Sequence, residues 1–327
     1  MKRLEFLQLC GGMLIASQLP DKACARLLEP IAGPTSLRTI KKITIAVGAT
    51  APIRALHISD THLTRVDERD NERKHSLAAS RQRVFPWAEH YFDAAIRYAR
   101  ENNLMLLHTG DLQDFVSEAN LDFIAEQMGV GDWYASAGNH EFSQYVGEAR
   151  EDAAYRMQSY AKVQSAFPND LTVASRVING VNFVAIDDGY YNVTAEQHEA
   201  VKREMERGLP VVLMCHVPLY TPQHCQTILK GNGGVAGYMT GAPLSITETY
   251  QQDPSRPASE QWRNRTVQQR AEQSTLDFIA WLKEQPQLKA ILCGHCHDFF
   301  EERFSPTAMQ YTVEAGYKGG AYEIEFV

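Results

Sequence analysis

Five short apolar segments of this chain are each followed directly by residue types that bind metal ions. These residues are Asp60 and His62, Asp111, Asn139 and His140, His216, and His295 and His297. If the segments are β-strands of an open α/β sheet, ligands bind beyond their carboxyl ends. The pattern therefore predicts an α/β fold in which five loops converge on one rim.

Strand and helix signals alternate along the rest of the chain. Apolar runs bounded by turn residues predict strands at 39–47, 53–59, 104–107, 132–137, 181–186, 210–215 and 289–293, and one or two within 310–327. Helical spacing predicts helices at 84–102, 117–128, 149–166 and 274–285. Another helix should begin at Thr194, because Gln197 completes a capping-box signature.

Three stretches allow more detailed expectations. The lysines of the strand at 39–47 place it at a sheet edge. Residues 64–83 are dense in both charge signs, so we expect a solvated loop there. The helix at 84–102 is expected to bury one face, formed by Trp87, Tyr91, Ala94 or Ala95, and Tyr98.

Composition bounds the class of protein and its partners. The 327 residues are 44% hydrophobic and 22% charged, which is ordinary for a globular chain. The formal net charge of −8 argues against a long footprint on nucleic acid or an anionic membrane. We therefore expect no nucleic-acid partner.

The first 25 residues have the features of an export signal. Lys2 and Arg3 precede an apolar stretch from Leu9 to Leu19, and small residues follow around Cys24. The stretch is too short for a transmembrane anchor. We expect a periplasmic or extracellular protein; the alternative is a frayed N-terminal helix of a cytoplasmic protein.

The remaining residues, 38–327, are expected to form one catalytic domain with an insertion. Residues 221–262 are rich in Gly, Pro, Ser, Thr and Gln, and have few apolar runs. A connection of this length is unusual inside a compact domain, so we interpret it as a lid.

Taken together and in this order, the motifs resemble those of the calcineurin-like metallophosphoesterase superfamily. They read Asp-x-His at Asp60, Gly-Asp-x-x-Asp at Gly110, Gly-Asn-His-Glu at Gly138, a lone His216 and Gly-His-x-His at Gly294. The resemblance spans roughly residues 53–300. It implies a four-layer α/β/β/α sandwich of two mixed sheets flanked by helices.

The resemblance also implies two divalent metal ions, for which Mn, Fe and Zn all suit carboxylate and imidazole ligands. The first ion would be held by Asp60, His62, Asp111 and His297, and the second by Asp111, Asn139, His216 and His295. Asp111 would thus serve both ions. Such a pair of ions, about 3.5–4 Å apart, clamps a phosphoryl group and acidifies a bound water.

Two further residues match catalytic positions of the family. His140 would assist the leaving group, and Asp114 would orient His140, although Asp114 could instead be a helix cap. Glu141 is assigned no more than a structural role. Protein Ser/Thr phosphatases have an arginine where this chain has Phe115, so that activity is not expected. The stretches around His216 and Asp188 look more like small bacterial-type phosphoesterases and phosphodiesterases.

We therefore expect a metal-dependent phosphoric ester hydrolase acting on a small-molecule phosphate monoester or diester. A metal-bound hydroxide would attack phosphorus while His140 assists the leaving group. A nuclease of the same fold and a catalytically silent metal-binding scaffold are the alternatives. Two other histidines, His57 and His108, are expected to be packed in strands. His224 is also assigned no functional role, and contact with substrate is its alternative.

Overall fold

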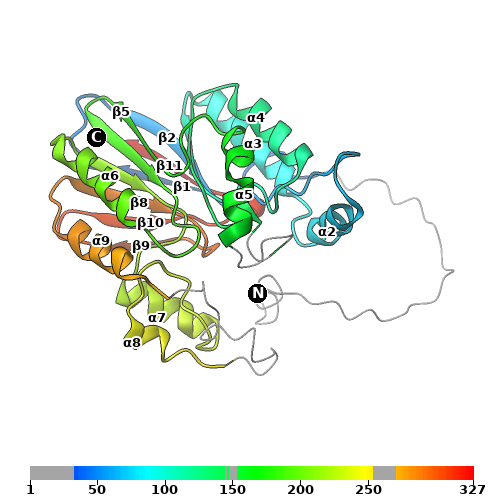
Figure 1. Ribbon diagram of the computed structural model, residues 1–327. Coiled ribbons are helices and arrows are strands. Elements are labelled where there is room, and N and C mark those ends of the chain that lie inside the picture. The colour runs from blue at the N-terminus through cyan, green and yellow to red at the C-terminus, as the bar shows by residue number, and fades with distance from the viewer. Residues whose placement is uncertain (1–32, 144–145, 147–152, 253–269) are drawn as a thin grey trace.

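The computed structural model describes residues 33–143, 146, 153–252 and 270–327 (Figure 1). The expected export signal lies outside these residues. No helix within the described ranges is long and apolar enough to span a membrane.

The first sheet has five strands in the order β1-β11-β2-β3-β4. Their bounds are β1 Thr39–Ile45, β11 Gly320–Phe326, β2 Ile53–Ile58, β3 Met105–Thr109 and β4 Trp133–Ser136. Strands β2, β3 and β4 are parallel, whereas β11 is antiparallel to β2. As expected from its lysines, β1 lies at an edge of the sheet.

The second sheet has six strands in the order β5-β6-β7-β8-β10-β9. Their bounds are β5 Val173–Ile178, β6 Val181–Ile186, β7 Val211–Met214, β8 Leu288–Cys293, β10 Met309–Thr312 and β9 Phe300–Arg303. Strands β6, β7, β8 and β10 are parallel, and the two edge strands are antiparallel to their neighbours. Both sheets are therefore mixed, as predicted.

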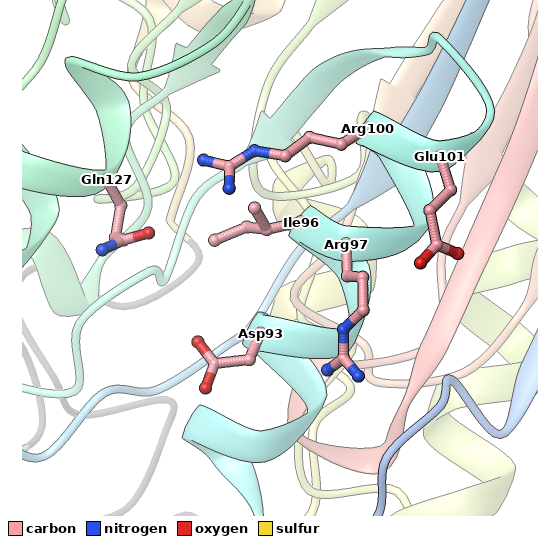
Figure 2. Close-up of a pocket in the computed structure, with 6 residues that line it drawn as sticks. All are labelled: Asp93, Ile96, Arg97, Arg100, Glu101 and Gln127. Atoms are coloured by element: carbon pink, nitrogen blue, oxygen red, sulfur yellow. The ribbon is translucent and has the colours of Figure 1, made fainter.

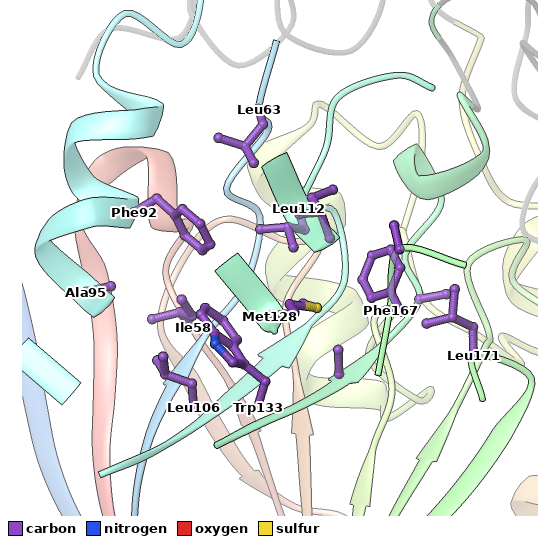
Figure 3. Close-up of a cluster of buried hydrophobic side chains, with 14 of the residues drawn as sticks. Ile58, Leu63, Phe92, Ala95, Leu106, Leu112, Met128, Trp133, Phe167 and Leu171 are labelled. Carbon is purple, nitrogen blue, oxygen red and sulfur yellow. The ribbon is translucent and has the colours of Figure 1, made fainter. Parts of the chain in front are cut away.

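Helices cover the outer face of each sheet, and the two sheets pack against each other. Helices α3 (Ala88–Glu101) and α4 (Glu118–Met128) lie on one side, and α6 (Ala195–Glu206) and α9 (Gln273–Lys283) on the other (Figure 1). Phe92 of α3 packs in one cluster with Ile58 and Trp133 of the first sheet (Figure 3). The predicted four-layer sandwich is confirmed.

The core between the sheets consists of apolar side chains from both. Leu107 and Ile324 of the first sheet belong to the same buried cluster as Phe183 and Met214 of the second. This packing brings the carboxyl ends of β2, β3 and β4 to the same rim as those of β7 and β8. The rim is where the predicted site residues lie.

Part of the charged stretch is a helix, so the prediction of a solvated loop at 64–83 is wrong. Residues Glu72–Gln82 form α2, whose N-cap Asn71 accepts a hydrogen bond from the backbone N–H of Lys74. Ala78 is its buried residue. Exposed charged side chains are present as expected, but they lie on a helix, and the C-terminal end of this helix reaches the rim.

The expected buried face of α3 is also displaced. Ala94 and Ala95 are buried as predicted, but Trp87, Tyr91 and Tyr98 are only half-buried. Phe92, Ile96 and Ala99 face the sheet instead. Tyr98 stays at the margin because its hydroxyl donates a hydrogen bond of 2.5 Å to Glu323 of β11.

Two edge strands, β5 and β9, were not predicted. A signal for β5 was present: Asn179-Gly180 joins it to β6, with φ of 44° and 79°. An Asn-Gly pair with both residues in this region is the preferred turn of a tight hairpin. Strand β9 is short and half-exposed, and gave no comparable signal.

The described part of the predicted lid has regular structure. Residues Pro222–Gly231 form α7 and Leu244–Thr247 form α8. Tyr238 and Tyr250 of this segment pack in one buried cluster with Tyr191 and Val217. Residues 253–262 lie outside the described ranges, and the role of the insertion as a lid stays a prediction. Helix α5 (Ala153–Gln164) completes the fold.

Candidate metal centre

Backbone hydrogen bonds join the loops that follow the strands. The N–H of Asp60 donates to the carbonyl of Gly110 at 2.9 Å, and that of His62 donates to Asp111 at 3.0 Å. Within the second sheet, the N–H of Gly294 donates to the carbonyl of His216 at 2.9 Å, and across the two sheets the N–H of His295 donates to Oδ2 of Asp60 at 2.9 Å. The five predicted loops therefore meet, as the sequence pattern required.

The backbone of these loops adopts an unusual conformation. Five of the predicted ligands have positive φ, namely Asp60 at 53°, His62 at 55°, Asp111 at 57°, His295 at 64° and His297 at 60°. The left-handed region is sparsely populated by residues other than glycine and costs about 1–3 kcal/mol per residue. Such conformations persist where the surrounding structure enforces them, which is typical of functional sites.

Two motif glycines allow the loops to approach one another closely. A Cβ at Gly294 would lie 1.9 Å from Oγ of Ser59, and one at Gly138 would lie 2.3 Å from Oδ1 of Asp111. No real side chain fits at such distances. The glycines that precede the metal-type residues therefore have a steric role.

The first group of candidate ligands consists of Asp60, His62 and His297, whose ligand atoms lie within 4.8 Å of one another. Oδ1 of Asp60 lies 3.1 Å from Nε2 of His297 and 3.9 Å from Nε2 of His62. Among the described residues, Oδ1 of Asp60 and Nε2 of His62 have no hydrogen-bond partner, although both are buried. Buried polar atoms are rarely left without a partner, so a bound cation would explain them.

The second group consists of Asp111, His216 and His295, with Asn139 beside them. Nε2 of His216 lies 3.2 Å from Oδ2 of Asp111, 3.2 Å from Oδ1 of Asn139 and 3.1 Å from Nδ1 of His295. Four potential donors therefore converge from four different loops.

Asp111 lies between the two groups. Its Oδ2 is 3.2 Å from Nε2 of His216 in the second group and 3.8 Å from Nε2 of His62 in the first. Its Oδ1 accepts a hydrogen bond of 2.8 Å from the backbone N–H of His140. Oδ2 is thus the atom placed to face both groups.

The ring nitrogens that face away from the groups are close to polar atoms that can orient the rings. Nδ1 of His216 lies 2.7 Å from the carbonyl of Thr109, Nε2 of His295 lies 2.9 Å from the hydroxyl of Tyr191, and Nδ1 of His297 lies 3.3 Å from that of Tyr317. Metal-binding histidines usually have such a partner on their second nitrogen. The donor set of carboxylate oxygen, amide oxygen and imidazole nitrogen fits divalent transition metals.

Charge and burial determine how these groups titrate in the absence of a metal ion. Burial alone would raise the pKa of Asp111, but nearby His216 and His140 lower it below its ordinary value. Burial would lower the pKa of His216, yet Asp111 and Asp60 raise it to about 10. Burial and the charge of His216 lower the pKa of His295 to about 3.

His140 and Asp114 lie beside the first group. Nδ1 of His140 is 2.8 Å from the backbone carbonyl of Asp114 and 3.2 Å from its Oδ1. The same Oδ1 is 3.0 Å from Nδ1 of His62. The predicted contact between Asp114 and His140 is present, and the contact with His62 was not anticipated.

A scan against protein-family models matches residues 53–299 to the calcineurin-like phosphoesterases. The chain belongs to this family. No curated protein sequence is similar enough to count as a match.

Several solved structures have low similarity to this calcineurin-like phosphoesterase. A dimetal phosphatase from Danio rerio has 12% identity and a TM-score of 0.44, over 83% of this chain and 89% of that one. A putative 5'-nucleotidase from Staphylococcus aureus has 12% identity and a TM-score of 0.39, over 81% and 49%. A phosphopantetheinyl hydrolase from Mycobacterium tuberculosis has 11% identity and a TM-score of 0.38, over 82% and 92%.

The calcineurin-like phosphoesterase has one arginine at this site that the sequence did not indicate. Arg81 of α2 donates to both carboxylate oxygens of Asp114, at 2.6 and 2.8 Å. The charge pattern of its segment is typical of a solvated loop, in which arginines are common. Glu141, in contrast, has the structural role expected: its carboxylate accepts from the backbone N–H groups of Asp111 and Gly138.

Other histidines of the phosphoesterase lie apart from the two groups. His57 and His108 are buried and hydrogen-bonded to Thr109 and Thr61, as expected for packed residues. His224 is buried and stacks on Phe300, with ring centroids 4.1 Å apart. It therefore packs the base of α7.

A shallow cleft of about 280 Å³ lies between α3 and α4, away from the candidate metal centre. Figure 2 shows its lining, which is formed by Asp93, Ile96, Arg97, Arg100, Glu101 and Gln127. None of the predicted site residues contributes to it.

Proposed function

We propose that this calcineurin-like phosphoesterase hydrolyses a small-molecule phosphate monoester or diester with the help of two divalent metal ions. The observation that supports this most directly is the position of Asp111. Its Oδ2 lies 3.2 Å from a histidine of one group and 3.8 Å from a histidine of the other. A single carboxylate oxygen placed in this way suits a ligand shared by two ions.

The positions of the proposed ligands place them in two sets, one for each ion. Asp60, His62 and His297 would hold the first ion with Asp111, and Asn139, His216 and His295 would hold the second with Asp111. When bound, the ions would supply positive charge to the phosphoryl oxygens and acidify a water molecule. Manganese, iron and zinc all accept this donor set.

His140 is proposed to stabilise or protonate the leaving oxygen. Asp114 contacts its Nδ1, and Nε2 is the nitrogen to which we assign the contact with the leaving oxygen. In the absence of metal, burial lowers the pKa of His140, but Asp111 and Asp114 raise it above its ordinary value. A protonated imidazole can donate to an oxygen that becomes negatively charged.

The experiment is to compare His140→Ala with the wild-type protein on bis-p-nitrophenyl phosphate and p-nitrophenyl phosphate with added Mn²⁺. General acid catalysis typically contributes about 100- to 10,000-fold, so kcat should fall by a factor in this range. Metal content should stay near that of the wild type, because His140 belongs to neither ligand set. His198→Ala on α6, which packs beside Trp281, is the matched control.

Two results would count against the proposal. Full activity in His140→Ala would remove the role given to this residue. A wild-type protein that binds no metal and hydrolyses neither substrate would contradict the proposed reaction, and would favour a non-catalytic scaffold.

A further inference from the structure

Arg81 and Asp114 form a buried, two-point ion pair at the edge of the candidate metal centre. Nε of Arg81 donates to Oδ2 of Asp114 at 2.6 Å, and its Nη2 donates to Oδ1 at 2.8 Å. The side chains are 13% and 0% exposed. Paired contacts between guanidinium and carboxylate are among the strongest and most directional in proteins.

The carboxylate held by Arg81 contacts two histidines with different proposed roles. Oδ1 of Asp114 lies 3.0 Å from Nδ1 of His62, a proposed ligand, and 3.2 Å from Nδ1 of His140. The two rings are nearly perpendicular, with an interplanar angle of 89° and centroids 4.7 Å apart. Oδ1 can face both ring nitrogens only if the plane of the carboxylate is fixed, and Nδ1 of His140 is also 2.8 Å from the backbone carbonyl of Asp114.

The end of α2 is itself held against this pair. The guanidinium carbon of Arg81 lies 4.9 Å from the ring centroid of Phe85. Phe85 in turn stacks on His62, with centroids 4.6 Å apart and an interplanar angle of 7°. Arg81 therefore reaches Asp114 over the aromatic ring that covers His62.

A lysine could not replace these contacts. Its ammonium is a point charge without the planar fork that fixes the plane of a carboxylate. Asp114 also needs a positive partner, because a buried carboxylate without one costs several kcal/mol. The planar guanidinium of Arg81 thus fixes the plane of the Asp114 carboxylate, and its positive charge stabilises the buried negative charge.

We propose that Arg81 is a positioning residue, which fixes the Asp114 carboxylate so that it orients His140 toward the leaving group and His62 toward the first metal site. This inference rests on the function proposed above. Arg81 acts through Asp114, and no contact between Arg81 and substrate is required.

The test compares Arg81→Met and Arg81→Lys with the wild type and with Arg83→Met, an exposed arginine two residues further on. Turnover is measured at saturating Mn²⁺ on phosphate esters with a good leaving group, p-nitrophenol, and a poor one, phenol. Mn²⁺ affinity is measured by titration of the metal-free proteins. Both Arg81 variants should show a larger fall in kcat on the phenyl ester than on the p-nitrophenyl ester.

We expect kcat on the phenyl ester to fall by about 10- to 100-fold, and the affinity of one Mn²⁺ site to weaken by a similar factor, as is usual when a partner of a metal-binding or catalytic histidine is disturbed. Arg83→Met should match the wild type in both measurements. Because Arg81→Met could unfold locally, Arg81→Ala is assayed with free guanidinium, which should restore part of the lost phenyl-ester turnover.

A kcat loss that is equal for the two leaving groups would overturn the inference, as would unchanged Mn²⁺ affinity or a failure of guanidinium to restore turnover. These results would leave the proposed function standing if wild-type protein hydrolyses the esters and His140→Ala does not. An inactive wild-type protein would instead contradict the proposed function itself.

Discussion

Asp111 is the residue on which both proposed metal sites depend. Its Oδ2 faces histidines of both groups, whereas His216 belongs to only one. Its neighbours also hold it tightly, since its backbone N–H donates to Glu141 at 2.7 Å and its Oδ1 accepts from the N–H of His140. A substitution of Asp111 should therefore have wider effects than a substitution of His216.

We expect Asp111→Ala to lose both ions and His216→Ala to lose one. Metal content per chain, measured by mass spectrometry after dialysis, should fall from about two to near zero in the first variant and to about one in the second. His75→Ala, at an exposed histidine of α2, should keep the wild-type content. If Asp111→Ala still held both ions, the shared-ligand assignment would be wrong.

His57 should make the protein less stable in acid. Burial, with a contribution from His108, lowers its pKa to about 3 in the folded state, whereas the unfolded value is about 6.5. Between these pH values the unfolded chain binds a proton that the folded chain does not. Stability is therefore lost as the pH falls below about 6.5, by about 1.4 kcal/mol per pH unit.

We expect His57→Gln to reduce the dependence of stability on pH. The free energy of unfolding, measured in urea between about pH 6 and 4, should fall less steeply than in the wild type by about 1.4 kcal/mol per pH unit. His75→Gln should leave the slope as it is. An equal slope in His57→Gln and wild type would mean that His57 is not buried in its neutral form.

At the scale of elements, the capping box of α6 should contribute to stability and not to activity. Oγ1 of Thr194 accepts from the N–H of Gln197 at 3.2 Å, and Oε1 of Gln197 accepts from the N–H of Thr194 at 2.9 Å. Helix α6 covers the outer face of the second sheet, and its Val201 and Met205 pack there. The cap therefore stabilises a layer that does not form the rim.

Thr194→Ala should lower the free energy of unfolding by about 1 kcal/mol, the usual cost of a lost N-cap. Turnover of p-nitrophenyl phosphate should not change at temperatures where the protein is folded. Thr194→Ser, which keeps the hydroxyl, should remain within a few tenths of a kcal/mol of the wild type. A loss of kcat comparable to that of His140→Ala would show that α6 does influence the site.

At the scale of the whole molecule, the candidate metal centre joins the two sheets. Asp60 and Asp111 follow strands of the first sheet, and His216 and His297 follow strands of the second. Metal ions bound between them would connect the two halves of the sandwich. Nε2 of His62 is buried and has no hydrogen-bond partner within the described residues, and a metal ion would satisfy it.

Removal of metal by a chelator should therefore lower Tm, and added Mn²⁺ should raise it again with concentration. At a free concentration 100 times Kd, one site that binds only the folded state adds about 2.7 kcal/mol. Calorimetry of the metal-free protein with increasing Mn²⁺ measures the effect, and Asp111→Ala should show almost none. A Tm in the wild type that does not respond to metal would argue against the proposed sites.

The features of the fold and of the candidate site that could be predicted are those that depend on residues close together in the sequence. The strand ends before Asp60, Asp111 and His216, and the cap at Thr194, were readable because apolar runs and cap residues act within one turn or strand. The convergence of their loops followed from the rule that parallel strands present their carboxyl ends together. The mixed four-layer fold was implied by the resemblance to the calcineurin-like metallophosphoesterases and is confirmed.

Contacts between distant segments were not readable in this way. The sequence alone determined which residues end the strands and which chemical types stand there. It did not show that β11 lies between β1 and β2, that Phe92 and not Tyr91 faces the sheet, or that Arg81 meets Asp114, 33 residues away. These depend on how whole layers pack, because a charged side chain on a short helix has the same local pattern whether it faces solvent or a buried carboxylate.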